Sequence, residues 1–396
     1  MNNLKELNSE RIYALDALRA IMMLLGIVLH AGITYGSADY ANFWPLKEPG
    51  SSIGFDIIVA IIHFFRMPVF FVASGYFGAL LFYKKGPQQM LKNRVKRILL
   101  PLLAGVLFVY PLAVFAFTFT KSAFSGVGMP LNIAWEEMIA GKFLPYNVLH
   151  LWFLYFLIFY SFGGWVIAKI FHRNTVFTQL VNKVFGYILQ RFWLRLVCLT
   201  ILFFLCQFWI GEPFLTTNNK WSIEAPIFIT YFLFFKTGWV IFRTNSLEKM
   251  KAHPIAQLVS ATLLFFLFIL IPWPDLAAWL YIRELLSALF GSMFIFGFIA
   301  FFMTYFNTYS PRLSYIMEAA YWVYIIHLPI VAFIPGLMSG STMPVFLKFL
   351  ITLSVTSIIC FVSYHYCVRN TSIGMFLNGK IHKQRKVVVV NDMIIE

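Results

Sequence analysis

The chain has 396 residues, of which 60% are hydrophobic, 19% aromatic and only 12% charged. An average soluble domain carries about 25% charged residues, so this composition excludes an ordinary water-soluble protein and indicates a chain embedded in lipid. The formal net charge of +15 does not call for a nucleic-acid partner, because the distribution of the basic residues along a membrane chain accounts for it.

Apolar runs of about 20 residues recur along almost the whole chain, each long enough to cross the hydrocarbon core of a bilayer as a helix. The sequence therefore predicts an all-α, polytopic integral membrane protein with about ten transmembrane helices. The expected spans lie near 12–35, 54–83, 97–120, 147–171, 193–211, 222–242, 255–272, 281–306, 318–336 and 344–367.

Basic residues gather in alternate connections between the spans. These connections, the N-terminus and the C-terminal tail hold 22 of the 31 Lys and Arg residues, whereas the other connections hold few. Cytoplasmic loops carry this excess, so we expect both termini inside and the loops 36–53, 121–146, 211–221, 273–280 and 337–343 outside. The expected location is the bacterial inner (cytoplasmic) membrane.

Residues 1–368 are predicted to form one transmembrane domain, followed by a basic cytoplasmic tail over 369–396. We expect no bound cofactor. No metal site is expected either, since the four cysteines lie in apolar runs without the paired spacing of a metal site and are interpreted as packing residues. These are Cys198, Cys206, Cys360 and Cys367.

The first span carries ionisable groups on a single helical stripe, formed by Asp16, Arg19, Met23, Gly26 and His30 at spacings of three and four. Ionisable groups at membrane depth are costly and usually functional. Arg19 and His30 share a face but lie about 16 Å apart along the axis. We therefore expect Arg19 to pair with Asp16 one turn away, with His30 deeper in the membrane.

The second span carries Asp56, His63 and Arg66 at helical spacings. Counting from the outer surface, His63 and His30 lie at similar depth, so a reaction centre between the two helices is one interpretation and a structural histidine at 63 is the other. Pro68 and the pair Ser74-Gly75 indicate a kinked or broken helix.

Arg94 and Arg97 follow at the start of the third span, where they are candidates for binding a phosphate or pyrophosphate. The alternative is that they only set topology. Later, His150 and Trp152 open the fourth span. Trp152 fits either an aromatic belt at the lipid interface or a surface for stacking sugar rings. Glu318 is a candidate partner for Arg19.

Four sequence segments resemble the acyltransferase-3 family of membrane acyltransferases. The family's Arg or Lys followed by ten residues and His matches Arg19 to His30. Its RxxR, FFxxSG and YxxYLxH elements resemble the remaining three segments. Those segments are Arg94-Val-Lys-Arg97, Phe70-Phe71-Val-Ala-Ser74-Gly75-Tyr76 and Tyr321-Trp-Val-Tyr324-Ile-Ile-His327.

Within that family the chain is most similar to members that succinylate osmoregulated periplasmic glucans. Three segments carry this closer resemblance: Phe65-Arg66-Met67-Pro68-Val69-Phe70-Phe71, His150-Leu151-Trp152-Phe153-Leu154 and Ile325-Ile326-His327-Leu328-Pro329. The resemblance implies an acyl-CoA donor at the cytoplasmic face, a glucan acceptor outside and an essential His30. It also makes other glucan-biosynthesis proteins candidate partners, beside the acceptor glycan and the lipid bilayer.

The predicted function is therefore O-acyl transfer, most simply of succinyl from succinyl-CoA, onto glucan hydroxyls. The candidate site residues fall into three groups according to their expected role. They are His30, Asp16, Arg19 and His63 for catalysis; Arg94, Arg97, Arg66 and Ser74 for the donor; and Asp56, His150, Trp152, Tyr324 and His327 for the acceptor.

His30 is interpreted as a general base or as a transient acyl carrier, and the sequence leaves both routes open. Three other functions also remain open. One is acetylation of another cell-envelope polysaccharide, and another is a proton-coupled transporter or flippase that uses His30, His63 and Asp56 as a proton relay. The third is a structural membrane protein without chemistry.

Overall fold

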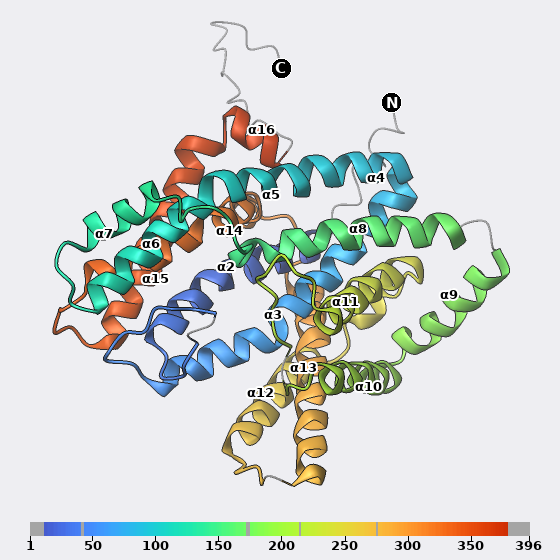
Figure 1. Ribbon diagram of the computed structural model, residues 1–396. Helices are drawn as coiled ribbons and strands as arrows, with labels where there is room; N and C mark the ends of the chain where they lie inside the picture. The colour runs from blue at the N-terminus through green and yellow to red at the C-terminus, as the bar shows by residue number, and fades with distance from the viewer. Residues whose placement is uncertain (1–11, 41–42, 172–174, 214, 275, 379–396) are drawn as a thin grey trace, which may run out of the picture.

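The computed structural model describes residues 12–40, 43–171, 175–213, 215–274 and 276–378. Within these ranges the chain forms helices joined by loops, and the β-structure is limited to an isolated bridge between Asn147 and Lys220. The expected all-α architecture is confirmed (Figure 1). Most of the expected basic tail, residues 379–396, lies outside the described residues.

Nine helical segments of the described chain are long and apolar enough to cross a membrane. Eight contain the helices α2 (Tyr13–Tyr35), α3 (Ile53–Leu80), α8 (Trp152–Phe171), α10 (Phe192–Ile210), α11 (Ala225–Arg243), α13 (Ala277–Tyr305), α14 (Pro311–Leu337) and α15 (Val345–Ser363). The ninth is the continuous run Pro87–Phe124. The tenth expected span corresponds to α12 (Pro254–Leu270), a shorter apolar helix of 17 residues. This length lies at the lower limit for a spanning helix.

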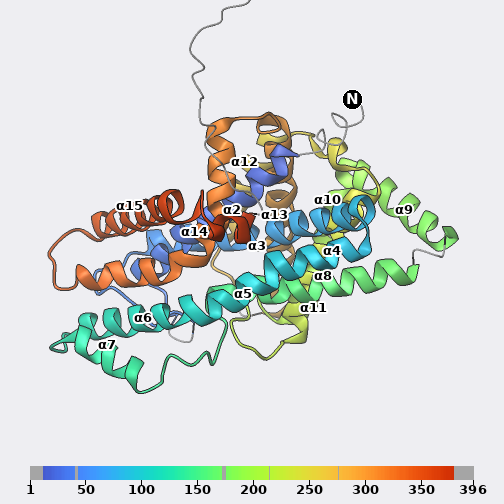
Figure 2. The same ribbon diagram turned by 90° about the horizontal axis from the view of Figure 1, so that it is seen from above.

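The run Pro87–Phe124 begins ten residues before the expected span and changes helical type along its length. It consists of α4 (Pro87–Arg94), α5 (Leu100–Ala104) and α6 (Tyr110–Phe124), joined by two five-residue π-helical segments, and it forms one long arm along the bundle (Figure 2). Pro101 cannot donate a backbone hydrogen bond to the Arg97 carbonyl. The hydroxyl of Tyr321 donates to that carbonyl instead, at 2.7 Å, which ties the arm to α14.

Two further helices occupy connections between the expected spans. They are α7 (Pro130–Ile139) and α9 (Thr175–Gln190). α9 exposes Val176, Leu180, Val184 and Tyr187 on one helical face. An amphipathic helix with an exposed apolar face of this kind suits the boundary between lipid and water.

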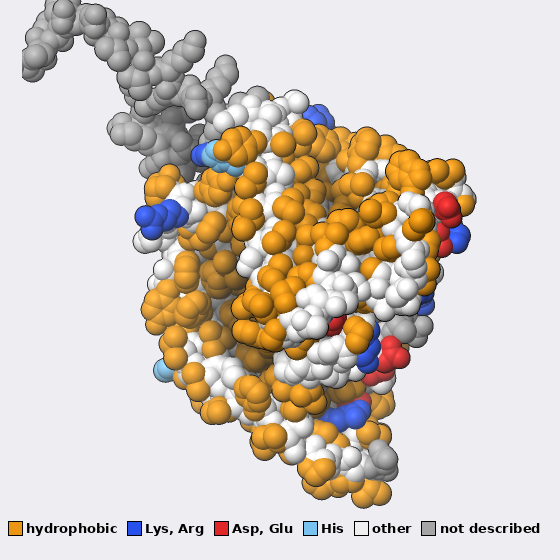
Figure 3. Space-filling view, turned by 90° about the vertical axis from the view of Figure 1, so that its left-hand side faces the viewer, with side chains coloured by type: hydrophobic (Ala, Val, Ile, Leu, Met, Phe, Trp, Pro, Cys, Tyr) orange, Lys and Arg blue, Asp and Glu red, His pale blue; other side chains and the backbone are white. Residues whose placement is uncertain are grey.

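The outer surface of the bundle is largely hydrophobic, and Figure 3 shows orange side chains covering most of one face, with charged side chains toward its margins. Large apolar side chains on several helices are exposed, among them Leu107, Phe108, Phe162, Ile201 and Ile358. A soluble protein rarely exposes apolar surface on this scale, so lipid is the expected environment of this surface.

The Ser74-Gly75 pair does not break α3, which continues without interruption from Ile53 to Leu80 through Pro68. Gly75 instead allows α3 to cross α11 at close range. A Cβ atom at Gly75 would lie 1.8 Å from the Phe235 carbonyl oxygen, and one at Gly238 would lie equally close to the Val72 carbonyl oxygen. The pattern therefore reflects close helix packing by small residues rather than a break in the helix.

Replacing Gly75 with Ala is expected to destabilise the bundle by about 1–3 kcal/mol or more, because a packed backbone atom must move. The measurement is the thermal unfolding midpoint of the purified protein in detergent. Gly163→Ala is the matched control, since its Cβ would meet nothing closer than 3.6 Å. Equal midpoints for the two variants would contradict the close crossing of α3 and α11.

Candidate active site

Two cavities lie inside the helix bundle. The larger, which we name the histidine cavity, has a volume of about 500 Å³, and its wall includes His30, His63, Arg66, His150 and His327. The smaller, which we name the arginine cavity, has a volume of about 370 Å³, and its wall includes Arg19, Arg94 and Arg97. The stripe on α2 runs along both.

Along this stripe, Asp16 and Arg19 line the arginine cavity, whereas Gly26 and His30 line the histidine cavity. Met23, between them, lines both. Arg19 forms the expected ion pair with Asp16, at 3.6 Å. Arg19 and His30 therefore line different cavities, as their expected separation along α2 predicts.

Phe70 and Phe153 also belong to the walls of both cavities. Together with Met23 they form an apolar boundary, which we name the waist. A ligand that reached from one cavity into the other would pass between these three side chains.

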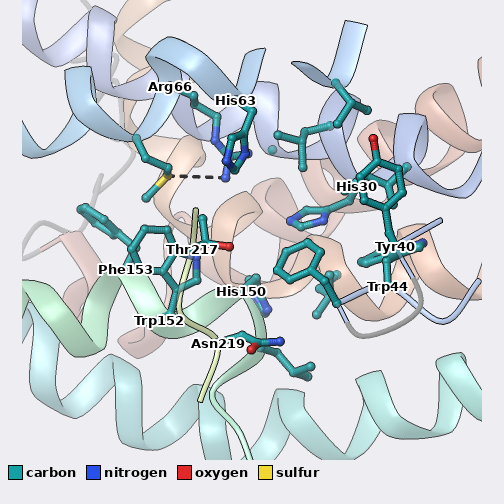
Figure 4. A pocket seen from close by; sticks show the side chains of 18 of the residues that line it. His30, Tyr40, Trp44, His63, Arg66, His150, Trp152, Phe153, Thr217 and Asn219 are labelled. Atoms are coloured by element: carbon teal, nitrogen blue, oxygen red, sulfur yellow. Dashed lines mark hydrogen bonds between the residues drawn. The ribbon is translucent and has the colours of Figure 1, made fainter. Parts of the chain in front are cut away.

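His30 is buried, with 5% of its surface exposed. Its ring stacks on Trp44, with centroids 5.1 Å apart and planes inclined by 17°. Figure 4 shows Trp44 and Tyr40 beside His30 at one end of the cavity. The Trp44 indole N–H donates to the Thr34 hydroxyl at 2.9 Å. Trp44, in the loop after α2, thus packs against one face of the His30 ring.

A buried ion pair fixes this loop to the bundle. Glu48 accepts from the Lys348 ammonium at 2.6 Å, and the two side chains are 7% and 5% exposed. Lys348 lies in the first turn of α15. Removing one partner of such a pair leaves an uncompensated buried charge, so the contact strongly favours the folded loop.

Asp56 does not line either cavity. Its carboxylate accepts from the backbone N–H groups of Ser37 and Ala38, at 2.7 and 3.2 Å. It also accepts from the hydroxyl of Tyr40, which does line the histidine cavity. Burial and the nearby Asp56 carboxylate raise the pKa of Tyr40 to about 12, so this phenol stays protonated at neutral pH. Asp56 thus shapes the loop after α2, and its expected role in acceptor binding stays a prediction.

His63 and Arg66 lie on α3, across the cavity from His150 and Asn219 (Figure 4). The Nε2 atom of His63 donates to the Leu215 carbonyl at 2.7 Å and so anchors the loop after α10. Arg66 donates through NH2 to the sulfur of Met67. Its NH1 group is buried and has no hydrogen-bond partner among the described residues. Glu318, the candidate partner of Arg19, lines the arginine cavity together with Arg19.

The other residues expected to bind the acceptor lie together in the histidine cavity: His150, Trp152, Tyr324 and His327. Trp152 is 4% exposed and packs on Tyr231 with centroids 5.3 Å apart, so it belongs to the cavity wall rather than to a lipid-facing aromatic belt. The Tyr324 hydroxyl donates to the His150 carbonyl at 2.8 Å.

The arginine cavity gathers the residues expected to bind the donor, except Arg66. Ser74 is part of its wall. Arg94 is partly buried, and its buried Nε and NH2 groups have no hydrogen-bond partner among the described residues. Arg97, by contrast, donates through NH1 to the Met375 and Phe376 carbonyls of α16 (Ser372–Asn378), at 3.1 and 2.7 Å. The two guanidinium groups are therefore not equivalent.

Several site residues were not anticipated from the sequence. Trp44, Thr217 and Asn219 come from loops that the helical pattern does not describe. An aromatic residue in an outer loop gives no signal of stacking on a histidine. The described part of the chain contains no group of three or more His, Cys, Asp or Glu side chains placed to hold a metal ion.

Comparison with known proteins identifies the family and the relatives of this chain. The family model described as "Acyltransferase domain" matches residues 12–365. Two curated relatives, both named glucans biosynthesis protein C, come from Escherichia coli strain K12 and from Escherichia coli O157:H7 strain EC4115. Each is 26% identical over 384 residues, which cover 94% of this chain and 95% of the relative. No solved structure matches this chain.

Proposed function

Because the chain belongs to the acyltransferase-3 family and is a membrane acyltransferase, we propose that it moves a succinyl group from succinyl-CoA onto hydroxyl groups of a periplasmic glucan. The name of the relatives supports a glucan as the acceptor. The observation that carries the proposal is the pair of cavities, one lined by guanidinium groups and one by imidazoles, which share the waist.

In this proposal the arginine cavity faces the cytoplasm and holds the phosphate groups of the donor. Arg94 has two buried N–H groups without a partner among the described residues, and a guanidinium fork matches phosphate oxygens in bidentate geometry. The acyl-pantetheine arm is a long, narrow chain and would pass the waist. Its thioester would then lie near His30, where the acceptor hydroxyl arrives from the other side.

His30 can serve the transfer in two ways. As a general base, its imidazole takes the hydroxyl proton while the hydroxyl oxygen attacks the thioester carbonyl carbon, the C–S bond breaks and the thiolate recovers the proton. As an acyl carrier, the imidazole itself displaces the thiolate and then passes the acyl group to the hydroxyl. Of these two routes, we favour the first.

Mass spectrometry of the periplasmic glucans tests the function. Glucans from cells that carry the chain should bear succinyl groups, which differ from acetyl groups in both mass and charge. Glucans from cells without the chain, or with His30→Gln, should lack them. Acetyl groups in their place would support the alternative of an acetyltransferase, and unmodified glucan in every strain would reject this acceptor.

A proton-coupled transporter is the second candidate, but its proposed relay requires Asp56 beside His30 and His63. Asp56 binds backbone amides of the outer loop instead, at 2.7 and 3.2 Å. The relay residues are therefore not gathered in one cavity, and acyl transfer is the better-supported function.

Replacing Arg94 with Gln is expected to weaken binding of acyl-CoA by about 1.5–3 kcal/mol, the value of a lost charge-assisted contact. The dissociation constant of CoA for the detergent-solubilised protein is the measurement. Arg97→Gln is the matched comparison and should cost less, because Arg97 already donates to two carbonyls of α16. If Arg94→Gln binds CoA as tightly as the unaltered protein, Arg94 does not bind the donor and serves only membrane topology.

A further inference from the structure

The tautomer of His150 is fixed by a proline on another helix. Pro329 has no N–H group, so it cannot donate to the Ile325 carbonyl one turn earlier in α14. The Nε2 atom of His150 lies 3.0 Å from that carbonyl oxygen. A carbonyl only accepts, so Nε2 must carry the hydrogen. In the neutral ring Nδ1 is then a bare acceptor, and it is buried without a partner among the described residues.

His327 is fixed in the opposite tautomer. Its Nδ1 atom lies 2.8 and 3.1 Å from the carbonyl oxygens of Tyr324 and Val323, in the preceding turn of its own helix. Nδ1 therefore carries the hydrogen, and Nε2 is the bare acceptor. This Nε2 is also buried without a partner among the described residues. It faces α2, since it would lie 3.4 Å from a Cβ atom at Gly26.

The two rings meet edge to face in the histidine cavity, with centroids 5.1 Å apart and planes inclined by 85°. Arg66 contributes a guanidinium to the same cavity, and further positive charges in a dry site are costly, which favours neutral rings. A buried acceptor left without a donor costs about 1–3 kcal/mol. The cavity thus holds two imidazole nitrogens that lack a hydrogen-bond donor among the described residues. A ligand with two donor groups would supply one to each of them.

We propose that His150 Nδ1 and His327 Nε2 form a paired acceptor that selects a ligand with two neighbouring hydroxyl groups, such as one sugar ring presented edge-on. This inference rests on the proposed function, since it takes the acyl acceptor to bind in the histidine cavity. A ligand with a single hydroxyl satisfies one nitrogen and leaves the other bare. The pair therefore acts in specificity and positioning.

His30 differs from this pair. Its ring lies 5.4 Å from that of His327, and the structure shows no backbone carbonyl that accepts from it within the described residues. No backbone carbonyl in the described part of the chain therefore determines which ring nitrogen of His30 carries the hydrogen. Backbone carbonyls thus fix the tautomers of His150 and His327 but not that of His30, which separates chemistry at His30 from recognition at His150 and His327.

Nitrogen-15 NMR of histidine-labelled protein tests the tautomers directly, without any need for acyl transfer. We expect an Nε2–H signal for His150 and an Nδ1–H signal for His327, and a β-linked gluco-oligosaccharide should shift the bare nitrogen of each ring. Identical tautomers would overturn the inference, as would unshifted bare nitrogens at a sugar concentration that saturates binding. If acyl transfer is absent but these signals hold, the proposed function fails and the paired acceptor stands.

Four substitutions test the roles of the two nitrogens of each ring one at a time. His150→Gln and His327→Asn keep an amide at the position that donates to the backbone and remove the bare nitrogen. His150→Asn and His327→Gln do the reverse and serve as matched controls. The first two should bind the gluco-oligosaccharide about tenfold more weakly, the value of one lost hydrogen bond, and the controls should bind it more tightly than the first two.

A monodeoxy analogue of the oligosaccharide completes the test. It should bind the unaltered protein about tenfold more weakly than the parent sugar, because one nitrogen loses its donor. In the variant that already lacks that nitrogen, the two sugars should bind equally, as in a double-mutant cycle. Additive losses for every combination of sugar and variant would overturn the pairing.

Discussion

Replacing His30 with Gln is expected to lower the rate of acyl transfer by about 10²–10⁴-fold, the contribution of a well-placed base. The reason is the position of His30, which lines the cavity and donates no hydrogen bond to the backbone among the described residues. A glutamine of similar size leaves the fold of α2 intact but cannot take a proton.

The measurement is transfer from succinyl-CoA to a gluco-oligosaccharide by the purified protein. His63→Gln is the matched control, because its amide nitrogen can keep the bond that His63 Nε2 donates to the Leu215 carbonyl. That variant should retain far more activity than His30→Gln. Activity of His30→Gln within tenfold of the unaltered protein would remove His30 from the chemistry.

Much of the fold follows from the sequence because each transmembrane helix must satisfy its own backbone groups. The stripe from Asp16 to His30 could be predicted for the same reason, since helical spacing alone places these residues on one face of α2. Ser74-Gly75 was misinterpreted as a break, because a small residue that permits a close crossing and one that permits a kink look alike in a sequence.

The walls of the site could be predicted only in part. Helical spacing gives the depth of His30 and His63, but the partners of their rings come from loops. The contact between Trp44 and His30 and the ion pair between Glu48 and Lys348 depend on how the loop after α2 folds. Lys348 lies 300 residues from Glu48, and no local pattern connects them.

The Arg66 guanidinium is expected to bind the distal carboxylate of the succinyl donor. Its NH1 group is buried without a partner among the described residues, and it would lie 3.1 Å from a Cβ atom at Gly26, one turn from His30. A buried cation with an open donor needs a partner in the cavity, and an anion is the partner that also neutralises its charge. Succinyl differs from acetyl by one carboxylate, which cannot enter a dry cavity without a fixed positive charge.

If Arg66 binds that carboxylate, Arg66→Gln should lower kcat/KM for succinyl-CoA by about 2–4 kcal/mol and that for acetyl-CoA much less. Both donors share the CoA group, so Arg94→Gln is the matched control and should lower both values alike. Steady-state kinetics with the two donors and one gluco-oligosaccharide gives the comparison. Equal losses for both donors in a folded Arg66→Gln protein would show that this arginine supports the cavity generally, with the choice of acyl group made elsewhere.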